Sequence, residues 1–223
     1  METDAVVGRV LAALDASGMT DKTLVLFTSD NGFASYTGAP HLEAQGHFPS
    51  GPLRGYKSDV WEGGHREPFI VRWPGVVRPG SVCGQLAHHA DVMATLADLF
   101  GAKLPASAGE DSFSLLPLLR GEDRPVREHA VSCAANGIQG VRKGPWKLVC
   151  TAPPQLYNLA DDLGETKNLA AEQPERVTEL LALREKLIAD GRSTPGEPQK
   201  NDVAVRRLPA AAPAKSRPVR VTK

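Results

Sequence analysis

The chain has 223 residues, 41% of them hydrophobic, and its 26 basic side chains balance its 26 acidic ones. This composition supports a folded core, and the zero net charge gives no sign of nucleic-acid binding or of attraction to an anionic membrane. No apolar run approaches the roughly 20 residues of a membrane span, and no charged start followed by an apolar stretch marks a signal peptide.

The first part of the chain has the pattern of alternating helices and strands. Apolar residues recur at helical spacing from Val6 to Leu14. Residues 24–28 are apolar almost throughout, which is typical of a strand buried on both faces of a parallel sheet. A long loop rich in Gly, Pro, His and Ser follows at 33–65. Further elements are predicted at 69–73 (strand), 92–100 (helix) and 115–119 (short apolar element), and this order predicts an α/β fold.

From about residue 126 the pattern changes to short strands separated by Gly and Pro turns. The strand-like segments are 130–133, 138–142, 146–149 and 155–157, which predicts an antiparallel sheet. Pro174 opens a helix that Gly191 ends. Residues 193–223 are basic and rich in proline, and we expect them to be disordered.

The cysteines Cys83, Cys133 and Cys150 form no recognisable framework of disulfides or zinc ligands. Small buried thiols are the simplest interpretation. A Cys133–Cys150 bridge stays open if neighbouring strands bring the two together.

Asp30 and Asn31 directly follow the predicted strand at 24–28. In open α/β sheets, ligands bind at the carboxyl ends of strands. A carboxylate beside an amide oxygen suits a hard cation such as Ca²⁺ or Mg²⁺. Asp-Asn-Gly is also an ordinary turn sequence, so the pair alone does not decide between the two interpretations.

The loop that contains Lys57 has features of an anion-binding segment. Three glycines within residues 55–64 let the backbone approach a ligand closely, and Lys57 and Arg54 offer positive charge to an oxyanion. A solvated basic loop is the alternative. His41, His47 and His65 are candidate proton donors or anion ligands, although each by itself has the character of a surface histidine.

The order of these segments resembles the type I sulfatases of the alkaline-phosphatase-like superfamily. The matching motifs run Phe27–Gly32, Leu53–Lys57, Trp61–Pro68 and Arg72–Gly75, and continue at 90–99, 114–121, 143–148, 156–159 and 164–169. The resemblance spans about residues 3–200. It implies the rear part of an alkaline-phosphatase-like sandwich at 1–125, a small C-terminal subdomain of antiparallel strands and a packing helix at 126–192, and a tail at 193–223.

The resemblance also implies roles for individual residues. Asp30 and Asn31 correspond to ligands of the active-site cation, usually Ca²⁺, and Lys57 corresponds to the lysine that contacts the sulfate group. Glu62, with the two glycines after it, is expected to be scaffold for the loop. We predict that His47 and His65 line the substrate pocket, a role that the resemblance itself does not assign.

The nucleophile of this family is a formylglycine, made from Cys or Ser in a C/S-x-P-x-R motif. None of the cysteines fits that motif, and Ser193-Thr194-Pro195-Gly196-Glu197 comes closest but ends in Glu. The resemblance places the nucleophile and an early aspartate pair before Met1. We therefore expect a chain that begins inside a helix midway through the catalytic domain and is inactive alone.

The resemblance implies a sulfate ester as substrate and a periplasmic or secreted location. From charge and apolar runs, we expect no nucleic-acid or membrane partner. Two alternatives stay open. One is a phosphodiesterase or phosphonate hydrolase of the same superfamily. The other is a catalytically silent fragment, or half of a two-chain assembly, that acts through binding.

Overall fold

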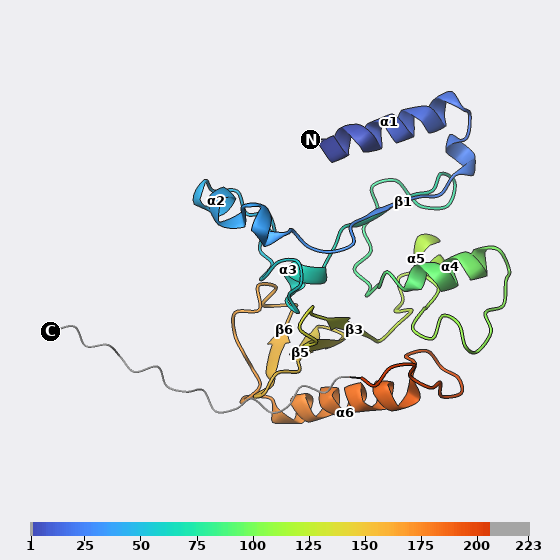
Figure 1. Cartoon of the computed structure of the whole chain (residues 1–223). Coiled ribbons are helices and arrows are strands. Elements are labelled where there is room, and N and C mark those ends of the chain that lie inside the picture. Colours follow the sequence, from blue (N-terminus) through green and yellow to red (C-terminus); the bar gives the residue numbers. More distant parts are fainter. Residues whose placement is uncertain (1, 206–223) are drawn as a thin grey trace.

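The computed structural model describes residues 2–205 and confirms the predicted order of helices and strands (Figure 1). Its α/β class is as predicted. No helix in the described part of the chain is long and apolar enough to cross a membrane. The elements are α1 (Glu2–Ala16), η1 (Thr20–Lys22), β1 (Val25–Thr28), η2 (Ser35–Thr37), α2 (Ala39–Ala44), α3 (Glu62–His65), β2 (Phe69–Arg72), α4 (Asp91–Leu99), α5 (Leu116–Leu119), β3 (His129–Cys133), β4 (Gln139–Lys143), β5 (Trp146–Val149), β6 (Gln155–Asn158) and α6 (Pro174–Asp190).

Strand β1 pairs with β2 in an antiparallel two-stranded sheet, with Val25 opposite Arg72 and Thr28 opposite Phe69. The prediction that residues 24–28 lie in a parallel sheet is therefore wrong within the described residues 2–205, where the partner strand runs antiparallel. An apolar run indicates that a strand is to be covered, but it carries no information about the direction of its partner. The cover is also incomplete, since Ile70 of β2 is 59% exposed.

Helix α1 extends from one end of the molecule (Figure 1). None of its residues is buried, and Val6 and Val10 are each about half exposed. An ion pair of 3.6 Å joins Asp15 of α1 to Arg72 of β2, and both side chains are largely exposed. The predicted helix is thus present, while its apolar face stays uncovered by the described residues.

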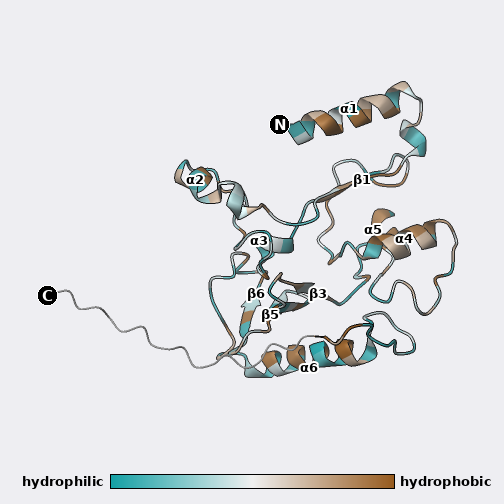
Figure 2. Cartoon of the chain, in the orientation of Figure 1, coloured by the Kyte–Doolittle hydropathy of each residue, from teal (hydrophilic) through white to brown (hydrophobic). Residues whose placement is uncertain are grey.

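The C-terminal strands form an antiparallel sheet in the order β3-β4-β5-β6, as predicted. Helix α6 lies along one face of this sheet, and hydrophobic and hydrophilic residues alternate along it (Figures 1 and 2). Val177 and Leu180 of α6 pack against Val141, Leu148 and Leu156 of the strands. The helix ends at Gly191, whose φ of 59° is a left-handed conformation that glycine adopts without strain.

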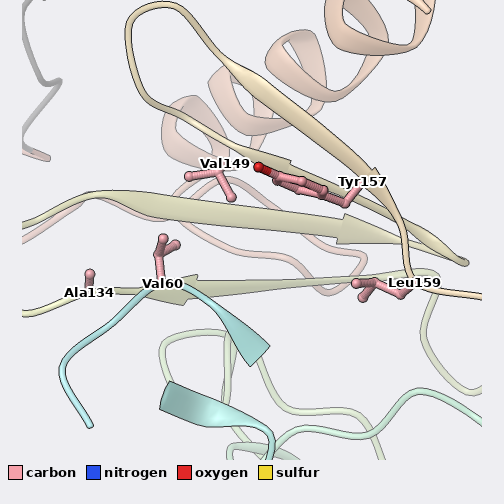
Figure 3. Packing of buried hydrophobic residues seen from close by; sticks show 5 residues of the cluster. All are labelled: Val60, Ala134, Val149, Tyr157 and Leu159. Atoms are coloured by element: carbon pink, nitrogen blue, oxygen red, sulfur yellow. The ribbon is translucent and has the colours of Figure 1, made fainter. Parts of the chain in front are cut away.

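The opposite face of the same sheet packs against the loop that precedes α3. Successive residues of a strand point to opposite faces, so Val149 and Tyr157 lie on this second face. There they form a buried cluster with Ala134, Leu159 and Val60 (Figure 3). Because Val60 lies just before α3, this packing fixes the position of the loop that also carries Lys57.

Hydrogen bonds to earlier residues anchor parts of 193–201, which the disorder predicted for the tail does not include. The backbone N–H groups of Ser193 and Thr194 both donate to the carbonyl of Glu110, and that of Gln199 donates to Asp190. Proline content alone does not exclude such local anchoring. The remainder of the predicted tail, 206–223, lies outside the described residues.

The three cysteines are free, so the Cys133–Cys150 bridge left open by the sequence is not formed. Cys133 is the last residue of β3 and Cys150 follows the last residue of β5, and strand β4 lies between these two strands.

Candidate functional site

The turn after β1 carries Asp30 and Asn31. The Ser29 hydroxyl donates to the carbonyl oxygen of Asn31 at 3.0 Å, which tightens the turn. Asp30 is exposed and Asn31 is half-buried. Both residues therefore lie in a short polar turn just after the carboxyl end of β1.

Gly32 brings this turn into close contact with α3. A Cβ at position 32 would lie 1.8 Å from the carbonyl oxygen of Gly63, a distance that only glycine permits. The Gly32 N–H donates to the carbonyl of Gly64 at 3.1 Å. The predicted scaffold role of the two glycines of α3 is thus visible as close backbone packing.

The backbone of Lys57 lies against the same turn. Its N–H donates to the carbonyl of Phe33 at 3.0 Å, and its side chain is exposed. The next residue, Ser58, has a positive φ of 78°, and the Asp59 carboxylate accepts the Tyr56 N–H at 2.9 Å. The structure therefore brings the Lys57 loop beside the turn of Asp30 and Asn31, although these segments are far apart in the sequence.

Glu67 lies close enough to Asp30 to feel its charge. Burial, and then the negative charge of Asp30, raise the pKa of Glu67 above its ordinary value. One carboxylate oxygen of Glu67, Oε1, is buried and has no hydrogen-bond partner. The sequence did not single out Glu67. It lies in the Trp61–Pro68 motif, which served only to recognise the family and gave no role to this carboxylate.

The oxygen-bearing side chains here suit the cation that the sequence implies. Asp30 and Asn31 supply hard oxygen donors, and the buried, unpartnered oxygen of Glu67 is a group that a cation would satisfy. Residues 2–205 contain no group of three or more His, Cys, Asp or Glu placed to hold a metal ion. The oxygen donors of Asp30, Asn31 and Glu67 are thus of the type that Ca²⁺ or Mg²⁺ prefers, and they do not form a complete ligand set by themselves.

A buried charged cluster holds α3 against the C-terminal sheet. The Lys147 ammonium of β5 lies 2.9 Å from Glu62 Oε1 and 2.8 Å from Glu165 Oε1, the latter outside hydrogen-bonding geometry. The second oxygen of Glu165 accepts the Glu62 N–H at 2.7 Å. Burial raises the pKa of Glu62, but the charge and hydrogen bond of Lys147, together with the charges of His65 and Arg142, outweigh burial and hold the pKa below the ordinary value. Burial raises the pKa of Glu165.

This cluster confirms that Glu62 is scaffold, and it adds Lys147 and Glu165, whose part the sequence did not reveal. The available signal was Lys147 itself, a lysine in the middle of an otherwise apolar strand. Such a side chain is almost never fully buried unless it is paired.

His65 belongs to the edge of the same cluster. Its Nε2 lies 2.9 Å from the Val60 carbonyl oxygen, 3.1 Å from Lys147 Nζ and 3.2 Å from the Ser132 hydroxyl. Burial, followed by the charge of Lys147, lowers the pKa of His65. His47 is exposed, and its backbone N–H donates to the backbone carbonyl of Leu42. The structure does not bring His47 and His65 together, and their substrate-binding role stays a prediction.

Two cavities lie beside the C-terminal sheet, of about 770 and about 300 Å³. Neither is lined by any of the predicted site residues. The larger is lined by several basic side chains and one tryptophan, among them Arg66, Arg142, Lys143, Arg176 and Trp146. The predicted site therefore coincides with neither of these two cavities.

Comparison with known proteins agrees with the motif order. Residues 1–102 match the family model for sulfatases. An N-acetylgalactosamine-6-O-sulfatase of Bacteroides thetaiotaomicron is 36% identical over 205 residues, which cover 83% of this chain and 40% of the relative. The chain thus spans about two fifths of the length of that curated relative.

Solved structures show the same likeness. A sulfatase structure from work on glycosaminoglycan metabolism in Bacteroides thetaiotaomicron superposes with a TM-score of 0.77 at 35% identity, over 83% of this chain and 42% of the other. A phosphonate monoester hydrolase of Agrobacterium radiobacter superposes with a TM-score of 0.60 at 25% identity, over 83% of this chain and 39% of the other. Sequence and fold together show that the chain belongs to the sulfatase family, within the alkaline-phosphatase-like superfamily.

Proposed function

We propose that this chain supplies the cation-binding and sulfate-binding residues of a sulfuric ester hydrolase. The observation that carries the proposal is the contact between two distant segments. The Lys57 N–H donates to the Phe33 carbonyl at 3.0 Å, next to the turn of Asp30 and Asn31. A cation held at that turn and an ammonium on the adjoining loop are two positive groups that one sulfate group can contact together.

Asp30 and Asn31 would hold a divalent cation, which we propose to be Ca²⁺. When bound, such a cation draws negative charge from the sulfate oxygens. The part of Lys57 is separate. Its exposed ammonium donates a hydrogen bond to a sulfate oxygen and stabilises the charge that accumulates as the ester bond breaks.

The loop geometry serves this role by limiting movement. Gly32 and Gly63 allow a backbone approach that no other residue permits, and the Lys147–Glu62 pair holds α3 from the other side. Positioning of charged groups before the reaction is the main source of electrostatic catalysis. The substrate-binding roles of His47 and His65 belong to the same proposal.

The attacking group of the family is a formylglycine, and no C/S-x-P-x-R motif for it occurs in this sequence. We therefore propose that the 223-residue chain alone does not turn over sulfate esters. We also propose a periplasmic or secreted location for the active protein, as the resemblance implies, and cell fractionation would test it.

The alternative activity is hydrolysis of a phosphonate or phosphodiester. It is favoured by the likeness to the phosphonate monoester hydrolase, although that protein is 25% identical and the sulfatase relative is 36% identical. Rates on a sulfate ester and on a phosphonate monoester with the same leaving group would distinguish the two.

The proposal is tested in a chimera in which this chain replaces the matching segment of the N-acetylgalactosamine-6-O-sulfatase. The chimera should hydrolyse a sulfate ester in preference to the matched phosphonate. A folded chimera that prefers the phosphonate would support the alternative.

A further inference from the structure

The register of the small sheet, extended past its last pair, brings two carboxylates toward each other. Paired residues run from Val25 with Arg72 to Thr28 with Phe69. Continued two residues past the last pair, the same register puts Asp30 opposite Glu67. The two segments stay together beyond this point, since the Gly32 N–H donates to the Gly64 carbonyl at 3.1 Å.

Such an arrangement is unfavourable without a further group. Like charges directly opposite each other in an antiparallel pair are destabilising. Oε1 of Glu67 is buried and has no hydrogen-bond partner, and a buried, unsatisfied polar atom adds a desolvation penalty. Among the ion pairs of residues 2–205, none includes Asp30 or Glu67. The neighbouring Arg66 is paired with Glu62 at 3.2 Å.

We infer that Glu67 contributes a carboxylate oxygen to the divalent-cation site of Asp30 and Asn31. This inference rests on the proposed function of that site and adds a residue to it. A cation between the two carboxylates removes their repulsion and gives the buried oxygen of Glu67 a partner. The resulting set of two carboxylates and one amide consists only of hard oxygen donors, which is the chemistry of Ca²⁺ and Mg²⁺.

Calcium titration of the 223-residue chain, by calorimetry and by NMR chemical shifts, tests the inference. Glu67→Gln should weaken calcium binding on the order of ten-fold or more, as loss of a group at a metal site typically does. Glu67→Asp keeps the carboxylate and should retain part of the affinity. Glu175→Gln removes one exposed acidic charge from α6 and should bind calcium like the unaltered chain.

Thermal unfolding separates this role from a structural one. Without calcium, Glu67→Gln should be at least as stable as the unaltered chain, because it loses the repulsion from Asp30. With calcium, its melting temperature should rise less. Calcium affinity in Glu67→Gln equal to that of the Glu175→Gln control would overturn the inference.

The variant Asp30→Asn separates the role of Glu67 from the existence of the cation site. If Asp30→Asn loses calcium and Glu67→Gln does not, the inference about Glu67 is wrong and the proposed cation site stands. If neither variant changes calcium binding, or the unaltered chain shows none at millimolar calcium, the proposed site is wrong and the inference with it.

Discussion

Lys147 and Glu62 form a buried ion pair of 2.9 Å that joins strand β5 to helix α3. Their side chains are 1% and 2% exposed, so neither charge is solvated by bulk water. The pair ties the C-terminal sheet to the short helix that packs on the Asp30–Asn31 turn. The stability of the candidate site therefore depends on a residue far from it in the sequence.

We expect Lys147→Met to destabilise the chain strongly, because it leaves Glu165 buried without a countercharge. Glu62 would keep only its pairs with the more exposed Arg66 and Arg142 as countercharge from arginine. Breaking a buried pair in this way typically costs about 3–5 kcal/mol. The control is Lys143→Met, which removes an exposed pair with Glu179 and should cost less than about 1 kcal/mol. Urea unfolding measures the loss of unfolding free energy in each variant. Equal losses would show that the buried ion pair stabilises the chain no more than the exposed one.

We expect Gly32→Ala to destabilise the chain, since its Cβ would lie 1.8 Å from the Gly63 carbonyl oxygen. Forcing atoms into a packed contact typically costs about 1–3 kcal/mol. Gly8→Ala is the matched control, because position 8 in α1 has nothing within 4 Å. There the change should stabilise the helix by roughly 0.5–1 kcal/mol. If the unfolding free energy changed in the same direction in both variants, relative to the unaltered chain, the close approach of Gly32 to Gly63 would be contradicted.

Stability should rise with pH across the range in which histidine titrates. Burial lowers the pKa of His65, His88 and His129 below the ordinary value of 6.5. The unfolded chain then binds protons that the folded chain does not, so stability is complete above the unfolded pKa and falls as pH drops below it. Urea unfolding at about pH 7.5 and about pH 5.5 should show the loss.

Replacing each of these three histidines by Gln should make that pH dependence smaller. An unfolding free energy that stays constant between the two pH values, or an unaltered slope in all three variants, would show that these side chains are not protected from protonation.

The isolated chain should show no sulfate ester hydrolysis and only weak calcium affinity. Even with Glu67, its side chains supply fewer oxygen donors than the roughly 6–8 that Ca²⁺ takes, and the family's nucleophile motif is absent from the sequence. A sulfate ester assay together with calcium calorimetry checks this. Turnover of the sulfate ester together with tight calcium binding would contradict the expectation that this chain holds only part of the active site.

The helices and strands could be predicted because their signals are local. Helical spacing from Val6 to Leu14, and Pro174 and Gly191 at the two ends of α6, each act over a few residues. The pairing of β1 with β2 could not be predicted in the same way. The apolar run at 24–28 indicates burial, whereas the choice of an antiparallel partner depends on contacts more than 40 residues away in the sequence, from Thr28 to Phe69.

The candidate site was predicted only in part. The order of family motifs selected Asp30, Asn31 and Lys57, and the structure brings the backbones of these segments together. It could not select Glu67, because the approach of that residue to Asp30 depends on the pairing of β1 with β2. Lys147 was missed for a related reason, since its partner Glu62 is 85 residues away.

Turnover of a sulfate ester by the chimera with the N-acetylgalactosamine-6-O-sulfatase tests the central claim most directly. We expect Lys57→Ala and Asp30→Ala each to lower kcat on the order of 10²–10³-fold, because each removes a group that stabilises charge in the transition state. Lys103→Ala, at an exposed lysine outside the site, should leave kcat unchanged. A Lys57→Ala chimera that turns over as fast as the Lys103→Ala control would contradict the assignment of this chain's share of the active site.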